Sequence, residues 1–336
     1  MLLALAVPAL AEGGPVMVSL GDSYSSGEGI EPFYGQEAEM ALRCQDPDWL
    51  AHRSEKSWPG MLTLPGLEGP MREHKDTNWF FAASSGAKSF HLWQITPEEA
   101  ATGQSAEQQK KYSREGISGA AVLPPQLAIF DVLDEKGLKA DYVTLSIGGN
   151  DIGFVKIVSA AAGGSLSRLE GDTPEEKAEA LVNTIRTDPA IRGDIRRAYT
   201  DVARRAGSQA RILVAGYPLL LAPEGGDGIF PAESARILNL ACGLLNDFLR
   251  EIVEECRAGG ISIWFVSVEE AFAGHGAYSP DPYINPLLSS TGTQDLNSPG
   301  WLSMYSIHPN EKGAEAYARC VQAAIDALEA ETPARP

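Results

Sequence analysis

Short apolar runs alternate with longer amphipathic stretches along this chain. The runs that predict β-strands are Val16–Leu20, Trp79–Ala83, Tyr142–Ile147, Ile212–Gly216 and Ile261–Val266. The stretches with helical periodicity are Gln126–Glu135, Pro174–Ala206, Glu233–Cys256 and Asn310–Leu328. Apolar residues recur at helical spacing in the third stretch, which predicts a stripe that packs on a sheet: Ile237, Leu240, Leu244, Leu245, Phe248, Ile252 and Val253.

The alternation of strands and helices is typical of an α/β fold, with a parallel sheet covered by helices on both faces. Ligands of such folds bind at the carboxyl ends of the strands. The chain has 336 residues, of which 44% are hydrophobic, enough for one sizeable core. Length alone would also allow two domains. Because no Pro/Ser-rich linker or internal repeat divides the sequence, we expect a single domain over residues 12–336.

The first residues form a short apolar run of their own. Residues 1–11 end in Ala9-x-Ala11, which resembles the end of a secretory signal cleaved before Glu12, although a charged leading region is absent. The alternative is an extension of the first strand. No other apolar run reaches the roughly 18 residues that span a bilayer. We therefore expect a soluble protein that is secreted or periplasmic, with no stable membrane insertion.

The charge of the chain excludes some partners. The formal net charge is −18 and the pI is about 4.7. Such an acidic protein is not expected to bind nucleic acid or to dock electrostatically on anionic membranes. Most of the acidic residues are expected on solvated helix faces, so the net charge does not identify the substrate.

Ser23 carries the strongest chemical signal in the sequence. It follows the first predicted strand within the run Gly-Asp-Ser-Tyr-Ser-Ser-Gly-Glu-Gly of residues 21–29. A serine between a strand end and a helix start is where an α/β protein would hold a nucleophile. The same position also suits an ordinary helix N-cap serine. Asp22 and Glu28 are expected to fix the turn rather than to react.

Three distant segments complete a set of groups for acyl transfer. Gly148-Gly149-Asn150 follows the third predicted strand, Gly86 follows the second, and His308 precedes the last predicted helix. A hydroxyl, a base and hydrogen-bond donors for an oxyanion are what this chemistry requires. The order of these segments along the chain is more specific than any one of them.

These blocks closely resemble the SGNH hydrolases, the GDSL esterase and lipase family, in its secreted bacterial branch. The resemblance extends from Val16 to about Val321. It implies a three-layer α/β/α sandwich with a central parallel five-stranded sheet of flavodoxin-like order. It also implies that Ser23 is the nucleophile and that His308 is the base. The implied oxyanion donors are the backbone N–H groups of Ser23 and Gly86 and the side-chain amide of Asn150.

The sequence departs from this family at one position near the base. Many members carry an aspartate three residues before the histidine, where this chain has Tyr305. The resemblance implies that the backbone carbonyl of Ser306 orients His308 instead, giving a Ser–His dyad. A carbonyl can fix the imidazole tautomer but stabilises its charged form less than a carboxylate does. Asp281 and Asp295 remain alternative orienting groups.

The cysteines and the other histidines indicate no metal or cofactor. Cys44, Cys242, Cys256 and Cys320 could form two disulfides, but the middle two share one predicted helix, about 21 Å apart, too far to pair. The branch often has cysteines at positions that hold His52 and Ser84 here, so that disulfide is expected to be missing. His275 is the only rival base, whereas the remaining histidines, His52, His74 and His91, are expected to be surface or packing residues.

Two functional classes fit these observations. The first is a monomeric serine esterase or lipase that hydrolyses acyl esters or glycero(phospho)lipids, with a carbohydrate O-acetyl esterase as an alternative. The second is a non-catalytic glycan- or lipid-binding module with a retained hydrolase pocket. The polar stretch of residues 98–119 is expected to be a lid or a solvated insertion.

Overall fold

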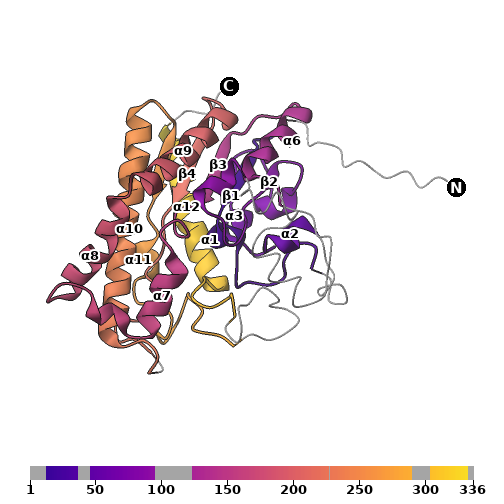
Figure 1. Cartoon of the computed structure of the whole chain (residues 1–336). Coiled ribbons are helices and arrows are strands. Elements are labelled where there is room, and N and C mark those ends of the chain that lie inside the picture. Colours follow the sequence, from indigo (N-terminus) through magenta and orange to yellow (C-terminus); the bar gives the residue numbers. More distant parts are fainter. Residues whose placement is uncertain (1–12, 37–45, 95–122, 227, 290–302, 332–336) are drawn as a thin grey trace.

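The computed structural model describes residues 13–36, 46–94, 123–226, 228–289 and 303–331. Its centre is a five-stranded parallel sheet with the strand order β2-β1-β3-β4-β5 (Figure 1). This order is that of a flavodoxin-like fold, so the predicted fold class is confirmed. The strands are β1 (Met17–Gly21), β2 (Trp79–Phe81), β3 (Tyr142–Ser146), β4 (Arg211–Ala215) and β5 (Ile263–Val266).

The strands are buried along almost their whole length. Every residue of β1, β2 and β3 is buried, and β4 is intermediate only at Arg211. Parallel strands covered on both faces read as continuous apolar runs, which is why the sequence pattern located all five. The register pairs Gly21 at the end of β1 with Ser146 at the end of β3. The segments that follow these two strands therefore start side by side.

The helices form the outer layers (Figure 1). Helices α8, α9 and α10 pack together on one side of the sheet, whereas α12 packs with α3 and contacts β4 and β5. The α-helices are α1 (Ser23–Ser26), α2 (Pro47–Leu50), α3 (Trp58–Met61), α6 (Ile129–Glu135), α7 (Phe154–Ala162), α8 (Pro174–Arg186), α9 (Pro189–Ala206), α10 (Ala232–Ala258), α11 (Glu269–Phe272) and α12 (Glu311–Glu331). The 3-10 helices are η1 (Met71–His74), η2 (Ser89–Leu92), η3 (Gln126–Ala128) and η4 (Ser165–Arg168).

The apolar stripe predicted on α10 is largely buried. Ile237, Leu245, Phe248, Ile252 and Val253 are buried, and the helix packs against β5 and the neighbouring helices. The stripe therefore faces the core. Cys242 and Cys256 lie on this same helix and are free, as is Cys320; Cys44 lies outside the described residues.

The prediction of one continuous helix over residues 174–206 is wrong. The stretch expected as a single helix over Pro174–Ala206 is two helices, α8 and α9, separated at Asp188. The backbone of Asp188 is extended (φ −79°, ψ 109°) because a residue before proline is disfavoured in the α region. Its carboxylate caps the new helix by accepting from the Ala190 N–H at 2.8 Å, with Pro189 in the first turn.

Several sequence expectations concern residues outside the described ranges. These are the signal-like residues 1–11, the polar stretch 98–119 and Asp295. Among the described residues, no helix combines the length and the apolar character needed to cross a membrane.

Candidate active site

Ser23 stands at the carboxyl end of β1, where the chain turns directly into helix α1. Gly21 has a φ of +120°, and a Cβ there would lie 2.3 Å from the carbonyl oxygen of Ser146, so only glycine fits at this position. Asp22 is the N-cap of α1, and its carboxylate accepts from the Tyr24 N–H at 3.0 Å. The turn leaves Ser23 7% exposed at the carboxyl edge of the sheet.

Hydrogen bonds of the Asp22 carboxylate link the segment that holds Ser23 to the end of β3 and the glycines that follow it. It accepts from the Ser146 hydroxyl at 2.7 Å and from the Tyr217 hydroxyl. The Tyr217 oxygen in turn accepts from the Gly149 N–H at 2.8 Å. Burial raises the pKa of Asp22 from 3.8 to about 6, although its three hydrogen bonds oppose this shift. Sequence reasoning missed Tyr217, because nothing near it marks it as a partner of Asp22.

Gly86 and Asn150 follow β2 and β3 at the same edge of the sheet as Ser23. The side-chain amide of Asn150 donates to the Ala87 carbonyl at 2.9 Å. This bond uses one of its two N–H groups and orients the other. The next residue, Asp151, accepts from the Ser89 hydroxyl at 2.6 Å, so the second and third blocks are joined twice. Gly86 has a φ of +77°, a conformation that favours glycine.

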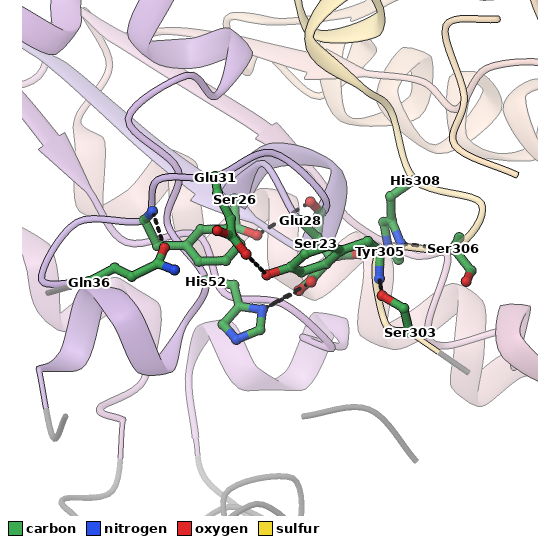
Figure 2. Close-up of polar contacts among 11 residues, drawn as sticks. Ser23, Ser26, Glu28, Glu31, Gln36, His52, Ser303, Tyr305, Ser306 and His308 are labelled. Atoms are coloured by element: carbon green, nitrogen blue, oxygen red, sulfur yellow. Dashed lines mark hydrogen bonds and ion pairs between the residues drawn. The ribbon is translucent and has the colours of Figure 1, made fainter. Parts of the chain in front are cut away.

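His308 reaches Ser23 from the other end of the chain. Its Nε2 lies 2.9 Å from Ser23 Oγ, and its Nδ1 lies 3.2 Å from the carbonyl oxygen of Ser306 (Figure 2). The preceding residue, Ile307, has a φ of +60°, which is strained for a β-branched side chain. The Tyr24 hydroxyl, on the nucleophile's own helix, donates to the Ile307 carbonyl at 2.9 Å and ties this strained segment to Ser23.

Asp281 and Asp295 are the alternative orienting groups for His308, and His275 is the rival base. Asp281 bonds to Lys312 and to His275, whose ring stacks on Tyr283 at 3.9 Å. His275 also places its Nδ1 2.8 Å from the Asp281 carbonyl oxygen, a contact that orders this loop and does not involve Ser23. Asp295 lies outside the described residues.

Tyr305, which stands where many family members have an aspartate, points away from the His308 ring. Its hydroxyl donates to Glu31 at 2.6 Å, and its backbone N–H donates to the Ser303 hydroxyl at 3.0 Å (Figure 2). Tyr305 therefore anchors the loop that carries His308 to Glu31, just after the first block of residues 21–29.

A buried acidic and basic pair lies beside this site, and sequence reasoning did not anticipate it. The Nδ1 atom of His52 lies 2.8 Å and 2.9 Å from the two carboxylate oxygens of Glu28, and both side chains are buried (Figure 2). The His52 ring stacks on Phe33 at a centroid distance of 4.6 Å. His52 has partners where a surface or packing histidine was expected. The only signal in the sequence was its departure from the cysteine that the family resemblance implies there.

The electrostatic environment of His308 contains two opposing effects. Burial lowers the pKa of His308 from 6.5 because the charged imidazolium is poorly solvated, and the negative charge of Glu28 acts in the opposite direction. The pKa of Glu28 lies below its ordinary value of 4.5, since the charge and hydrogen bonding of His52 outweigh the burial of the carboxylate. Within the described ranges, no cluster of three or more His, Cys, Asp or Glu side chains could hold a metal ion.

Comparison with known proteins identifies the family. The model of the GDSL-like lipase/acylhydrolase family matches residues 81–316. A lipase of Streptomyces rimosus is 25% identical over 273 residues, 80% of this chain and 75% of that protein. Lipase 1 of Streptomyces coelicolor is 26% identical over 316 residues, 92% of this chain and 84% of that protein.

Two solved structures share the fold. The extracellular lipase of Streptomyces rimosus superposes with a TM-score of 0.54 at 21% identity, covering 93% of this chain and all of that one. Phospholipase A1 of Streptomyces albidoflavus NA297 gives a TM-score of 0.55 at 20% identity, covering 94% and 99%. Since the family model spans well over half of the 336 residues, the chain belongs to the GDSL-like lipase/acylhydrolase family and is an ester hydrolase.

Proposed function

We propose that this protein is a secreted serine esterase or lipase that cleaves carboxylic esters through a Ser23–His308 dyad and an acyl-enzyme. The observation that carries the proposal is the separation of 2.9 Å between Ser23 Oγ and His308 Nε2. This distance allows direct proton transfer between a nucleophile and its general base.

The reaction proceeds in two matched halves. His308 Nε2 takes the proton of Ser23 as Oγ attacks the ester carbonyl carbon, and the carbonyl electron pair moves onto oxygen. When the tetrahedral intermediate collapses, the bond to the alcohol oxygen breaks and the imidazolium gives its proton to the departing alcohol. Water then attacks the acyl-serine with the same base, which releases the acid and restores Ser23.

Three groups are suited to hold the oxyanion. These are the backbone N–H groups of Ser23 and Gly86 and the second side-chain N–H of Asn150, whose first N–H already bonds to Ala87. In the described part of the chain, neither of the two backbone N–H groups donates to a protein acceptor. Donors fixed in advance stabilise the charge that develops on the carbonyl oxygen without reorganisation.

The Ser306 carbonyl orients the base in this proposal. It accepts the Nδ1 proton of His308 at 3.2 Å, so that Nε2 is left free to accept the proton of Ser23. The carbonyl carries only a partial charge and therefore leaves much of the imidazolium charge unbalanced.

We propose acyl esters or glycero(phospho)lipids as the substrate class. Support comes from the two Streptomyces relatives, which are lipases, and from the phospholipase A1 with the same fold. Export is proposed on the apolar residues 1–11 and on the extracellular lipase among the solved structures.

Hydrolysis of p-nitrophenyl esters from acetate to palmitate tests the activity and the chain-length preference together. Ser23→Ala is expected to abolish turnover. Ser57→Ala is the matched control, because the buried Ser57 hydroxyl has no hydrogen-bond partner within the described residues. Hydrolysis of acetate alone would favour a carbohydrate O-acetyl esterase, and no hydrolysis of any ester would favour a non-catalytic binding module.

A further inference from the structure

The proposed dyad lacks a full negative charge at the place where a triad carboxylate would stand. His308 Nδ1 faces a backbone carbonyl, and the side chain at the expected aspartate position, Tyr305, bonds to Glu31 instead. A protonated imidazole in a partly buried site needs an opposite charge nearby to be stabilised. A carboxylate at the same edge of the sheet could supply this charge to His308 from another direction.

Glu28 occupies such a position by the geometry of its backbone. Its N–H donates to the carbonyl of Ser23 at 3.1 Å, so the residue is fixed relative to the nucleophile. The next residue, Gly29, packs directly on the histidine segment, because a Cβ there would lie 3.4 Å from both His308 Cβ and the Tyr305 carbonyl oxygen. The backbone of Glu28 and Gly29 is thus held between Ser23 and the segment that carries His308.

The Glu28 side chain is buried, and for that reason its charge acts strongly on its neighbours. It is 1% exposed, and water does not screen a charge in such a position as it screens a surface charge. The negative charge of Glu28 raises the pKa of His308, and the proximity of His308 in turn lowers the pKa of Glu28. The coupling is reciprocal, as two interacting titratable groups require.

His52 is what keeps this buried carboxylate ionised. Burial alone would favour the neutral acid, but both carboxylate oxygens lie within 2.9 Å of His52 Nδ1. His52 is itself held in an uncommon backbone conformation with a φ of +51° and by stacking on Phe33. A strained residue that is fixed on several sides is typical of a functional position.

We propose that Glu28, held ionised by His52, is the positioning residue whose negative charge stabilises the protonated His308 during ester hydrolysis. The proposal rests on the dyad function above and deepens it. In a triad, a carboxylate in the loop before the histidine supplies this charge. Here Glu28, in the first block of the sequence, supplies it instead. Glu28 touches neither the substrate nor the reacting atoms, and it acts only through His308.

Other charged groups near the base have partners of their own. The titratable groups that face His308 or follow it in the chain are Glu28, His52, Asp22, Tyr24, Glu31 with Tyr305, Glu311 with Lys56, and Lys312 with Asp281 and His275. Of these, His52 acts against Glu28, because its electrostatic effect lowers the pKa of His308. Glu28 has a larger effect on the pKa of His308 than His52 has.

The test compares Glu28→Gln with the wild-type enzyme in the pH dependence of kcat/KM. The glutamine carbonyl can still accept from His52, so the variant removes the charge and keeps the hydrogen bond. The acid limb, which follows deprotonation of His308, is expected to move to lower pH by about one unit, the lower end of the range for a nearby charge. The plateau of kcat/KM is expected to fall by up to about tenfold, because one pKa unit corresponds to tenfold in stabilisation of the imidazolium.

Three further experiments separate this effect from structural damage. Glu31→Gln is the matched control, since it removes a carboxylate from the same loop, and its acid limb is expected to stay at the wild-type pH. NMR titration of the His308 imidazole in isotope-labelled protein assigns the shift to His308 rather than to Asp22, whose pKa is about 6. Glu28→Asp keeps the charge, so its acid limb is expected to lie close to that of the wild-type enzyme.

If Glu28→Gln does not fold, the double variant Glu28→Gln/His52→Gln takes its place, because removing both charges leaves neither unpaired. Its acid limb is expected to move in the same direction by a smaller amount. A folded Glu28 variant whose limb stays at the wild-type position would overturn the proposal, as would an equal shift in Glu31→Gln. Either result leaves the dyad standing if Ser23→Ala is inactive, whereas an active Ser23→Ala rejects the proposed function itself.

Discussion

The hydroxyl oxygen of Tyr217 accepts a hydrogen bond of 2.8 Å from the backbone N–H of Gly149. The same hydroxyl donates its proton to the Asp22 carboxylate. Tyr217 therefore fixes the residue before the proposed oxyanion donor Asn150 relative to the residue before the proposed nucleophile Ser23. A side chain that follows β4 thus links the segments that follow β1 and β3.

Tyr217→Phe tests this relationship. The change leaves the Gly149 N–H without its acceptor and removes one donor to Asp22. We expect the free energy of unfolding to fall by about 1–3 kcal/mol, the range for an unsatisfied buried group. We also expect kcat to fall more than KM rises, since the Asn150 segment loses its support. Thermal unfolding and steady-state ester hydrolysis measure the two effects.

Tyr199→Phe is the matched control for this substitution. Tyr199 is fully buried, and its hydroxyl has no hydrogen-bond partner within the described ranges. Its loss is expected to leave both stability and kcat close to wild type. Equal behaviour of the two phenylalanine variants would show that the Tyr217 hydroxyl has no positioning role.

Asn150→Ala tests the assignment of the oxyanion donor. Removing one such donor typically lowers kcat about 100- to 1,000-fold. The protein is expected to stay folded, because among the described residues the side chain makes one hydrogen bond, to the Ala87 carbonyl. Turnover of p-nitrophenyl esters and the melting temperature are measured together. A folded variant that turns over at the wild-type rate contradicts the assignment.

Asp281→Ala distinguishes a dyad from a triad. The Asp281 carboxylate bonds to Lys312 and His275 at the protein surface, where water screens such pairs and they contribute little to stability. We expect Asp281→Ala, and likewise Asp295→Ala, to keep most of the activity, whereas His308→Ala loses nearly all of it. Activity as low as that of His308→Ala in either aspartate variant would replace the dyad with a triad.

Glu28 makes stability depend on pH in the acid range. Its pKa in the folded protein lies below the ordinary 4.5, so the folded state favours the ionised form. Its stabilisation is therefore complete above pH 4.5 and is lost as the pH falls through the folded-state pKa. We expect the melting temperature of Glu28→Gln to fall less steeply with acidification than that of wild type. Parallel curves for the two proteins would contradict a pKa lowered in the folded state.

Asp22 contributes with the opposite sign. Its pKa is raised from 3.8 to about 6, so the folded protein holds the proton more tightly than the unfolded chain does. The contribution of Asp22 to stability therefore decreases as the pH rises from about 4 to 6. Asp22→Asn is expected to remove this decrease, which melting curves at pH 4, 5, 6 and 7 would reveal. An unchanged slope in that window would place the Asp22 pKa at its ordinary value.

The positions of the five strands could be predicted from the sequence alone, because a strand buried on both faces must be apolar at nearly every residue. The residues of the proposed dyad and oxyanion hole follow from the family resemblance, and Ser23, Gly86 and Asn150 each come after a strand whose end lies at one edge of the sheet. The break between α8 and α9 also has a local cause, because the Asp188-Pro189 pair ends one helix and begins the next. Such features depend on neighbours within a few residues.

Only the tertiary structure decided which distant groups meet. The pairing of Glu28 with His52 joins residues 24 positions apart, and the bond from Tyr217 to Asp22 spans 195. His52 alone reads as one more histidine in a polar segment, and Tyr217 as an aromatic residue after a strand. Hydrophobic periodicity determines which elements form and which faces they bury. The contacts between polar side chains depend instead on how the elements cross, so they emerge only when the fold brings those chains within hydrogen-bonding distance.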